Sequence, residues 1–570
     1  MQSTRYSEFL LTDPRQPKLT WLSTVVGVIA YCLIVTRWVR SARRLASPNP
    51  SRLPRLLLNT DVPFFQAPIR REVRRFWLRR QGYLVDHNGA AIPEIKGESR
   101  FSRFNQGYQL STQASLTAGN DPCLVWNEDR PEIILTQPEH VKEFYSRKAK
   151  EHRKPTNACM GHYFGRVMGQ CAGAVNGDLW RSIRSVFDPH FSHQCAKAFL
   201  GPMRCELSRW RGQLPAVPGR ADFVVEALET CRILPFKIIA LSVYRDVLTD
   251  ELNVVHDKVL LTTWFGRRER SSFYNMLPTM AKKNMDTFEA EWEVYNLNVV
   301  RIATEVGAHS VASGIACPVK DMYEQVKAGT IGIVNWLQTI DEILFANLDV
   351  TSAILAFLLI NLAMNPDVQT ELREEVLAQH REANGSAASS DDVYERYLQR
   401  SDTLLEYTCM ESTRLCPAVW FTLPEYATED LWIGGYRIKA GTCFIIDWAR
   451  LNTESPVWKS SMSEEGEKQH QHHQHHPGKT FRPQRFRDLS PLDYRWSMLR
   501  FGFGARKCIG KNFAVLMMKG FLLEVLAEYR LEMDGPPPTS GGWGATNVEL
   551  RNDRFTVMPR QNVRFYSLAG

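Results

Sequence analysis

The sequence predicts a mainly α-helical protein with small β-sheets, preceded by one N-terminal transmembrane helix. Three observations carry this prediction. An uncharged apolar run occupies residues 19–36, helical periodicity dominates the chain after about residue 130, and strand-like segments are few and short. The composition, with 44% hydrophobic and 23% charged residues, is that of a folded chain and excludes wholesale disorder.

Residues 19–36, LTWLSTVVGVIAYCLIVT, form the predicted membrane-spanning helix. The run is uncharged and lies within the range of roughly 17 to 25 residues that spans a bilayer. A cleaved signal peptide and a buried core helix are the alternatives, but the run is long for a signal peptide and lacks a small-residue cleavage site. Six arginines follow it within residues 37–55, against two arginines and one lysine before it, so the bulk of the chain should face the cytosol.

The chain therefore has four predicted parts. They are a lumenal N-terminus of residues 1–18, a single-pass anchor in the endoplasmic reticulum membrane of residues 19–36, a basic proline-containing linker of residues 37–55, and a folded cytosolic domain of residues 56–570. Within that domain, the histidine-rich tract 464–479 predicts a disordered surface loop, because nothing around it fixes ligand geometry for the alternative, a metal site. The twelve cysteines form no CxxC pair, which favours reduced thiols in the cytosol.

A second basic segment, IRREVRRFWLRR at residues 69–80, repeats arginine at helical spacing around Phe76 and Trp77. It fits a helix on the membrane surface and a solvated basic helix equally well. The whole chain carries a net charge of +8, which suits anionic membrane lipid or an acidic protein partner. The sequence holds no basic, aromatic-interleaved recognition module, so we expect no nucleic acid partner.

The clearest helical pattern covers residues 332–366 and predicts a long buried helix that Asn365 and Pro366 terminate. Its charged residues, which argue against a second membrane span, are Asp341, Glu342 and Asp349. The predicted strands lie chiefly in residues 431–448, around a Gly-Gly turn, and in residues 554–559.

The segment RFGFGARKCIGKNFAVLMMKGFLLEVL, residues 500–526, carries the candidate chemistry. Cys508 stands just before a predicted helix, where backbone N–H groups and the positive end of the helix dipole stabilise a thiolate, the form that ligates a metal. Gly504 and Gly510 flank it, and residues without a Cβ let the backbone turn sharply and approach a flat ligand closely. The alternatives are an ordinary buried thiol and a dinucleotide-binding loop, but Lys507 occupies the position of the third glycine that such a loop needs.

The stretch FGFGARKCIG resembles the heme-binding signature of the cytochrome P450 family. It matches the defining positions of the signature, which are Phe501, Gly504, Arg506, Cys508 and Gly510. The resemblance extends from about residue 180 to the end of the chain. It implies that residues 56–570 are a heme-thiolate catalytic domain with the cytochrome P450 fold and a heme b cofactor (iron protoporphyrin IX). It also implies that Cys508 is the proximal ligand of the iron, the metal-binding residue, that Phe501 shields its sulfur, and that Arg506 meets a heme carboxylate.

Two further motifs stand in the order that the family has them. Glu411 and Arg414 in YTCMESTRLCP resemble its ExxR motif, and the resemblance implies a structural network with an arginine downstream, here Arg485 in FRPQRF. Taken alone, ExxR places two charges on one helical face and means only a surface ion pair. Trp180 and Arg184 in NGDLWRSIR resemble the WxxxR motif, whose side chains hydrogen-bond a heme propionate in the family; arginine suits a carboxylate because its planar fork gives charge-assisted bonds.

The stretch ANLDVTS, residues 346–352, is similar to the family's AGxDT motif but departs from it twice. Asn347 replaces the glycine that helps open the oxygen groove, and Val350 stands where the family usually has a proton-relaying threonine. Asp349 is retained, whereas Thr351 is displaced by one residue, about 100° around an α-helix. We expect Asp349, acting through water and assisted by Thr351, to be the catalytic proton source. A π-type distortion that brings Thr351 inward and a polar group of the substrate are the alternatives.

The resemblance implies a monooxygenase that oxidises a small organic substrate with dioxygen, by hydroxylation, epoxidation or oxidative ring formation. No nicotinamide or flavin fingerprint is visible in the sequence, so electrons should come from NADPH-cytochrome P450 reductase. The cations expected to dock this partner are Arg181, Arg500, Lys507 and Lys511. A third departure from the family is Glu425, which lies near a position where many members have an arginine.

Three segments, LFANLDVTS, LNTESPVW and RFGFGARKCIGK, together resemble filamentous-fungal members that tailor secondary metabolites. Some of those members act on nonribosomal-peptide or diketopiperazine scaffolds. Two other functions stay open at this point. One is a heme-thiolate isomerase or dehydratase that uses no dioxygen, which Asn347 and Val350 favour because such enzymes often lose the proton relay. The other is a non-catalytic heme-binding membrane protein, which the intact signature around Cys508 argues against.

Overall fold

The computed structural model describes residues 67–98, 106–146, 152–159, 162–215, 221–248, 280–309, 317–385, 390–459, 477–535, 550–551 and 556–568. These residues all belong to one compact unit, residues 62–570. The predicted lumenal segment, anchor and linker, residues 1–55, lie outside the described residues and stay predictions.

Helices make up most of the described chain, which confirms the predicted fold class. In chain order the α-helices are α3 (Ala67–Arg80), α5 (Gly107–Ala118), α6 (Pro138–Ser146), α7 (His162–Met168), α8 (Gly177–Phe187), α9 (His193–Ala198), α10 (Leu200–Gly212), α11 (Ala227–Cys231), α12 (Ile233–Tyr244), α15 (Met280–His309), α16 (Pro318–Lys327), α17 (Ile333–Ala346), α18 (Ser352–Met364), α19 (Pro366–Gly385), α20 (Ser390–Gln399), α21 (Leu404–Leu415), α22 (Trp448–Glu454), α24 (Arg485–Asp488) and α25 (Lys511–Glu528).

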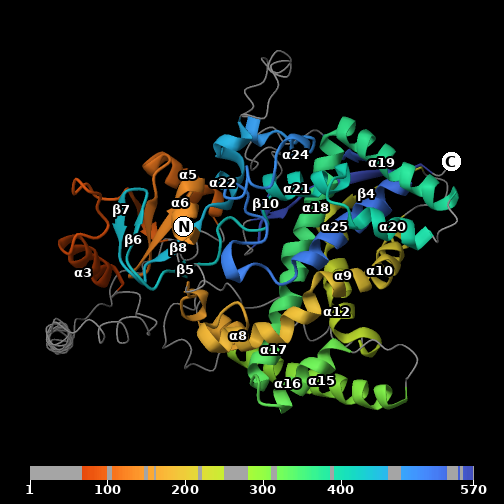
Figure 1. The fold of residues 1–570 in the computed structure, drawn as a ribbon, viewed down its shortest axis with the longest axis horizontal. Helices are drawn as coiled ribbons and strands as arrows, with labels where there is room; N and C mark the ends of the chain where they lie inside the picture. The colour runs from red at the N-terminus through yellow and green to blue at the C-terminus, as the bar shows by residue number, and fades with distance from the viewer. Residues whose placement is uncertain are drawn as a thin grey trace, which may run out of the picture. The chain divides into compact units, whose positions relative to one another are not determined.

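The strands form small sheets. They are β1 (Glu94–Glu98), β2 (Cys123–Asn127), β3 (Arg130–Leu135), β4 (Asp222–Glu226), β5 (Glu425–Tyr426), β6 (Leu431–Ile433), β7 (Tyr436–Ile438), β8 (Cys443–Ile446), β9 (Tyr529–Met533), β10 (Leu550–Arg551), β11 (Met558–Pro559) and β12 (Asn562–Ser567). The largest sheet has the order β1-β2-β3-β8-β5, a second has β4-β12-β9, and β6 pairs with β7 and β10 with β11. In Figure 1 the largest sheet and α3 lie on one side of the described fold and α19 and α20 on the other.

α17 and α18 form one long helical rod between these two sides (Figure 1). The rod, Ile333–Met364, is long and apolar enough to cross a membrane by length and composition, but most of it is buried inside the protein. Leu355, Leu358 and Ile360 of α18 are completely buried, as expected for a helix that is hydrophobic on all sides. The predicted core helix is thus confirmed, with one difference: a π-helical turn, Asn347–Thr351, separates α17 from α18.

The predicted strands are also present. Gly434 and Gly435 form the turn between β6 and β7 with φ angles of 54° and 83°, and β8 and β11 follow in the predicted segments. β1 to β3 were not predicted. β2 is buried at each of its five residues, so it lacks the alternation of polar and apolar residues that identifies a half-buried strand.

The histidine-rich insertion ends earlier than predicted. Residues 464–476 lie outside the described residues, but Pro477–Lys479 form a short 3-10 helix. The carbonyl of Gly478 accepts a hydrogen bond of 2.6 Å from Arg414 Nη1 in the buried core. The predicted disordered loop therefore cannot extend to residue 479, because its last residues are tied to α21.

Candidate functional site

Cys508 lies at the end of a loop that leads into α25. The loop folds back on itself because the Cys508 N–H donates a hydrogen bond of 2.8 Å to the Phe501 carbonyl. Gly502 and Gly504 have φ angles of 82° and 68°, in the left-handed region that glycine adopts without the steric cost of a Cβ. Gly510 is the N-cap of α25. Cys508 is exposed as a residue, so a ligand can approach the end of the loop that carries it.

The Cys508 thiol is crowded by protein atoms on most sides, and the resulting loss of hydration raises its pKa. The Gly510 N–H lowers that pKa, as do the Arg184 and Lys511 cations, whereas the Glu342 carboxylate raises it. The net shift is upward, so the predicted stabilisation of a thiolate at the helix N-terminus is outweighed by burial. A metal cation at the sulfur would reverse this balance, because a coordinating thiol is deprotonated.

Arg506 connects the Cys508 loop to the start of α8. Its guanidinium lies over the Trp180 ring, 4.9 Å from the ring centroid. It also donates hydrogen bonds to the Val175 carbonyl at 2.9 Å and to Asn176 Oδ1 at 2.8 Å. Two of the motifs singled out in the sequence therefore meet in space.

Arg184 makes a second connection between α8 and the same loop. Its Nη1 donates a hydrogen bond of 3.2 Å to the Lys507 carbonyl, across 323 positions of sequence. Its Nε lies 2.6 Å from Asp188 Oδ1, one helical turn further on. The guanidinium is thus held beside Cys508 by one partner on each side, in agreement with its lowering of the Cys508 pKa.

A buried ion pair lies beside this cluster. Lys154 Nζ is 2.9 Å from Glu425 Oε1, and both side chains are largely buried. Asn176 links Lys154 to Arg506. Its Oδ1 accepts one hydrogen bond of 2.7 Å from the backbone N–H of Lys154 and another from Arg506. Its Nδ2 donates a hydrogen bond of 2.8 Å to the Lys154 carbonyl. Tyr145 donates a further hydrogen bond of 3.3 Å to Glu425. Glu425 is therefore paired with a cation from a distant segment.

A polar stripe on α17 holds the chain segment 166–173 against it. The side chains of Gln338, Thr339 and Glu342 accept hydrogen bonds of 2.7, 3.2 and 3.0 Å from the backbone N–H groups of residues 170, 172 and 173. A Cβ on Gly173 would lie 1.9 Å from Glu342 Oε1, so a larger residue here would displace the Glu342 carboxylate. Burial raises the pKa of Glu342, while the Gly173 N–H and the more distant Arg184 and Lys154 cations lower it.

Partial exposure recurs along one face of the α17–α18 rod. Its members, at intervals of four residues, are Gln338, Glu342, Ala346, Val350 and Ile354. Because residues four apart share a helical face, these partly exposed residues follow one side of the rod. Glu342 belongs to this face and acts electrostatically on Cys508. We therefore take the face as one wall of the site and the Cys508 loop as another.

The π turn contributes Val350 to this wall and also contains Asp349 and Thr351. Asp349 and Thr351 are both buried, at 4% and 7% exposure. Thr351 Oγ1 lies 2.9 Å from Asn347 Oδ1, and Asn347 Nδ2 donates a hydrogen bond of 2.7 Å to the Ile343 carbonyl. A π-type distortion, one of the alternatives raised from the sequence, is thus present at this position.

A buried ion-pair network connects α21 to α24. It consists of Glu411, Arg414 and Arg485. Glu411 accepts from Arg414 Nε at 2.7 Å and Nη2 at 2.8 Å, and from Arg485 Nε at 3.0 Å. Glu411 and Arg414 have no exposed side-chain surface, and Arg485 has 2%. The Trp458 ring packs 4.8 Å from the Arg414 guanidinium. A network of this kind, with each charge satisfied, fixes the relative positions of α21 and α24.

Similarity to known proteins shows the family of this chain. The family model described as Cytochrome P450 matches residues 264–463 and 469–553. Cytochrome P450 monooxygenase lepD of Aspergillus flavus is 34% identical over 502 residues, which cover 86% of this chain and 91% of the relative. The chain belongs to the cytochrome P450 family.

Further relatives support the same assignment. Cytochrome P450 monooxygenase apdB of Emericella nidulans is 32% identical over 480 residues, covering 80% of this P450 and 89% of the relative. Cytochrome P450 monooxygenase PUL2 of Kluyveromyces lactis is 29% identical over 486 residues, covering 84% and 89%. This P450 is a heme-thiolate monooxygenase that uses dioxygen, a substrate and a redox partner.

The residues gathered around Cys508 fit a heme. A heme-thiolate site has one thiolate at the iron, and cations suit its two propionates. The P450 chain offers Cys508 with Arg184 and Arg506 beside it, and Lys154 linked to Arg506 through Asn176. A Cβ on Gly510 would lie 3.9 Å from the Cys508 sulfur, so this glycine leaves space beside it.

Several residues of the P450 site carry no signal in the sequence. Lys154, Asn176 and Glu342 are single polar residues in segments without a motif, and they join the site through contacts with chain segments more than a hundred positions away. One of the predicted residues behaves differently. Arg500 is not a docking cation, because it pairs with the buried Glu406 at 2.9 Å and only 14% of its side chain is exposed.

Proposed function

We propose that Cys508 is the proximal thiolate ligand, and thus the metal-binding residue, of a heme b iron in this P450. The observation that carries the proposal is the exposed Cys508 in a loop of left-handed glycines at the start of α25. When bound, the heme supplies the site at which dioxygen is activated and one oxygen atom is transferred to the substrate. Phe501 fixes the position of Cys508 through its carbonyl and shields the sulfur, while Gly504 and Gly510 keep the backbone close to the macrocycle.

Trp180, Arg184 and Arg506 hold a heme propionate in this proposal. All three converge from α8 and the Cys508 loop, and the pKa of the Arg506 guanidinium is lowered by burial, which a carboxylate partner would relieve. Lys154 is a further cation beside them.

Proton delivery is assigned to Asp349 acting through water, with help from Thr351. Asp349 is buried in the π turn, next to Val350 of the partly exposed face, and water bridges polar groups that do not touch. The carboxyl group relays a proton from solvent to a water at the reacting centre.

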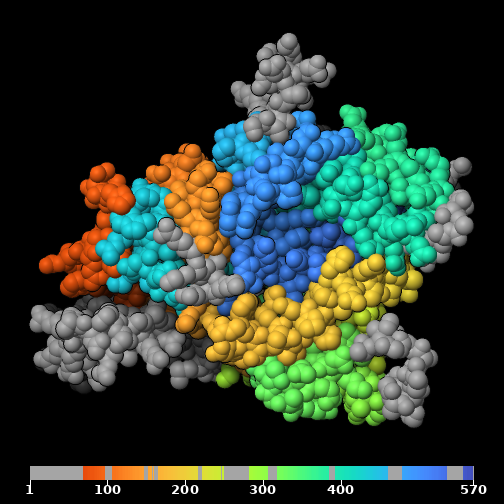
Figure 2. Space-filling model, in the orientation of Figure 1, coloured from red at the N-terminus to blue at the C-terminus, as the bar shows by residue number. Residues whose placement is uncertain are grey.

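Electrons come from NADPH-cytochrome P450 reductase in this proposal. Arg181, Lys507 and Lys511 are exposed around the Cys508 side of the protein and give an acidic flavoprotein a complementary surface. Figure 2 shows the C-terminal residues, in blue, at the surface between the yellow helices α8 to α10 and the green-blue helices α19 and α20.

A single-pass anchor at residues 19–36 attaches the enzyme to the cytosolic face of the endoplasmic reticulum membrane, and α3 is a second lipid contact. Ile69, Phe76 and Trp77 share one face of α3 and are 50%, 57% and 50% exposed. Large apolar side chains gathered this way on a basic helix are typical of membrane-surface helices. This exposed face favours the membrane-surface interpretation over a solvated helix.

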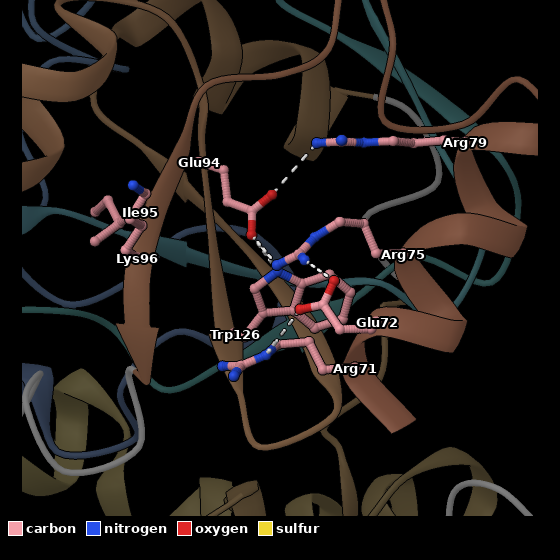
Figure 3. A pocket seen from close by; sticks show the side chains of 8 residues that line it. All are labelled: Arg71, Glu72, Arg75, Arg79, Glu94, Ile95, Lys96 and Trp126. Carbon is pink, nitrogen blue, oxygen red and sulfur yellow. Dashed lines mark hydrogen bonds and ion pairs between the residues drawn. The ribbon is translucent and has the colours of Figure 1, made fainter. Parts of the chain in front are cut away.

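The neighbouring face of α3 lines a pocket of about 420 Å³ with β1 and Trp126 (Figure 3). Four cations line it, namely Arg71, Arg75, Arg79 and Lys96, against the two carboxylates of Glu72 and Glu94. Glu94 binds both Arg75 and Arg79, and the surplus of two positive charges suits phospholipid headgroups.

The substrate is a small organic molecule of fungal secondary metabolism, of the nonribosomal-peptide or diketopiperazine type, and is hydroxylated, epoxidised or cyclised. Support comes from the fungal relatives and from the three segments that resemble tailoring enzymes. The test is to incubate the enzyme, the reductase and NADPH with an extract of a strain lacking this gene, under ¹⁸O₂. Consumption of one compound, with ¹⁸O in the product or loss of hydrogen on ring formation, supports the proposal. Turnover without NADPH and reductase would favour the isomerase or dehydratase alternative instead.

A further inference from the structure

We propose that Asn347 is a positioning residue for proton delivery: its side-chain amide holds the hydroxyl hydrogen of Thr351 and so makes Thr351 a hydrogen-bond acceptor toward the reacting centre. The inference rests on the proposed function of Asp349 and Thr351 and adds a residue to it. Asn347 was singled out from the sequence only as a side chain in place of the family's glycine. The structure shows that this side chain makes two hydrogen bonds within the π turn.

The direction of both hydrogen bonds follows from chemistry. Asn347 lies 2.7 Å from the Ile343 carbonyl, which only accepts, so the atom facing it must be the Nδ2 donor. The other end of the amide, Oδ1, then faces Thr351 Oγ1 at 2.9 Å. Because Oδ1 has no hydrogen, the Thr351 hydroxyl must be the donor. Its hydrogen is therefore committed to Asn347, and its lone pairs remain to accept.

The π turn makes this pairing possible. A π turn is wider than an α-helical turn, which changes the direction of residue 351 relative to its direction in a regular α-helix. Asn347 and Thr351 are four residues apart within the turn Asn347–Thr351, and Ser352 satisfies the Leu348 carbonyl through its own hydroxyl. The turn thus holds Thr351 in place by side chains.

Thr351 and Asp349 therefore have different roles in the reaction. Thr351 Oγ1 accepts a hydrogen bond from a water and keeps it in place, but Thr351 gives up no proton. Asp349 supplies the proton to that water, and solvent returns it to the carboxyl group, so the proton balance closes without the threonine. Val350, on the partly exposed face, cannot do either task because its side chain is a hydrocarbon.

The test uses the full-length holoenzyme with three variants, Asn347→Ala, Thr351→Val and the combination of both. Ser352→Ala is the matched control, since Ser352 also bonds within this turn but lies outside the pair. The first measurement is the share of consumed NADPH that ends as peroxide. We expect each single variant to raise it by about two- to ten-fold, the effect of one lost hydrogen bond, and the double variant to add nothing further. Additive effects would overturn the pairing.

The second measurement is the C–O stretching frequency of the carbon monoxide complex of the reduced protein. Asn347→Ala releases the Thr351 hydrogen, which can then bond to the carbon monoxide oxygen and lower the frequency. Thr351→Val and the double variant should stay near wild type, as should Ser352→Ala. An unchanged frequency in Asn347→Ala would contradict the assignment to Asn347. Absence of a thiolate-type carbonyl complex in the wild type would instead contradict the proposed role of Cys508.

Discussion

Glu411→Ala would leave two buried guanidinium groups, those of Arg414 and Arg485, without the carboxylate that contacts both. Four hydrogen bonds to Glu411 would be lost: two from Arg414, one from Arg485 Nε and one of 2.9 Å from the Arg482 N–H. Removing one partner from a buried charge network costs roughly 3 to 5 kcal/mol of folding free energy. Arg414 would keep its bonds to the Asn452 and Gly478 carbonyls.

The pH dependence of this loss has a definite sign. Burial alone would raise the pKa of Glu411, but Arg414 and Arg485 lower it below its ordinary value of 4.5. A lowered pKa in the folded state stabilises the protein above pH 4.5, and this contribution disappears as the pH falls through the folded-state pKa. The difference in stability between wild type and Glu411→Ala should therefore be largest near neutral pH and shrink in acid.

The assay is the yield of heme-loaded protein together with the free energy of urea unfolding at pH 7 and at a series of pH values below 4.5. Glu305→Ala is the control, because Glu305 pairs with Arg301 on an exposed helix face at 2.7 Å, with more than half of each side chain in solvent. Such a pair contributes at most about 0.5 kcal/mol. Glu411→Gln keeps one acceptor oxygen, so its loss of stability should lie between those of Glu411→Ala and Glu305→Ala. Wild-type yield and stability in Glu411→Ala would refute the structural role of the network.

Two further predictions concern stability and membrane binding. Burial raises the pKa of Asp447 to about 6, so its charge opposes folding increasingly as the pH rises from about 4 to above 6. Asp447→Asn preserves the cap on the Arg450 N–H and should be more stable than wild type at pH 7.5 by at most roughly 3 kcal/mol. In thermal unfolding near pH 4 the two proteins should be equally stable, and no gain at pH 7.5 would contradict this prediction. In a chain lacking residues 1–45, the double variant Phe76→Ser, Trp77→Ser should bind vesicles of anionic phospholipid about ten-fold or more weakly. Val294→Ser, at another exposed apolar position, should bind as the unsubstituted chain does. Equal binding by the unsubstituted chain, the double variant and Val294→Ser would exclude α3 as a lipid contact.

Sequence reasoning identified the parts of the fold that rest on local patterns. The helix over residues 332–366, the hairpin around Gly434 and the glycine-rich loop before α25 each have a periodicity or residue type that specifies them locally. The sequence pattern was insufficient for β2, which is buried on both faces and therefore resembles any short apolar run. The residues of the site that belong to motifs were named from the sequence, whereas their partners were not.

Those partners depend on tertiary contacts. Glu425 was noted only as a missing arginine, because nothing in the sequence connects it with Lys154, which lies about 270 positions earlier. Asn347 was noted only as a missing glycine, because its hydrogen bonds to Ile343 and Thr351 require the π turn, and a π turn has no simple sequence signature. The raised pKa of Cys508 follows from burial, which the sequence does not give and which outweighs the helix N-terminus seen in it.

The central claim is that Cys508 is the thiolate ligand of the heme. The most direct measurement is the absorption of the carbon monoxide complex of the reduced protein, in the wild type and in Cys508→Ala, with Cys443→Ala as a control at a buried cysteine of β8. We predict the red-shifted Soret band of a thiolate-ligated heme in the wild type and in Cys443→Ala, and its complete loss, together with turnover, in Cys508→Ala. Retention of that band by Cys508→Ala would contradict the assignment.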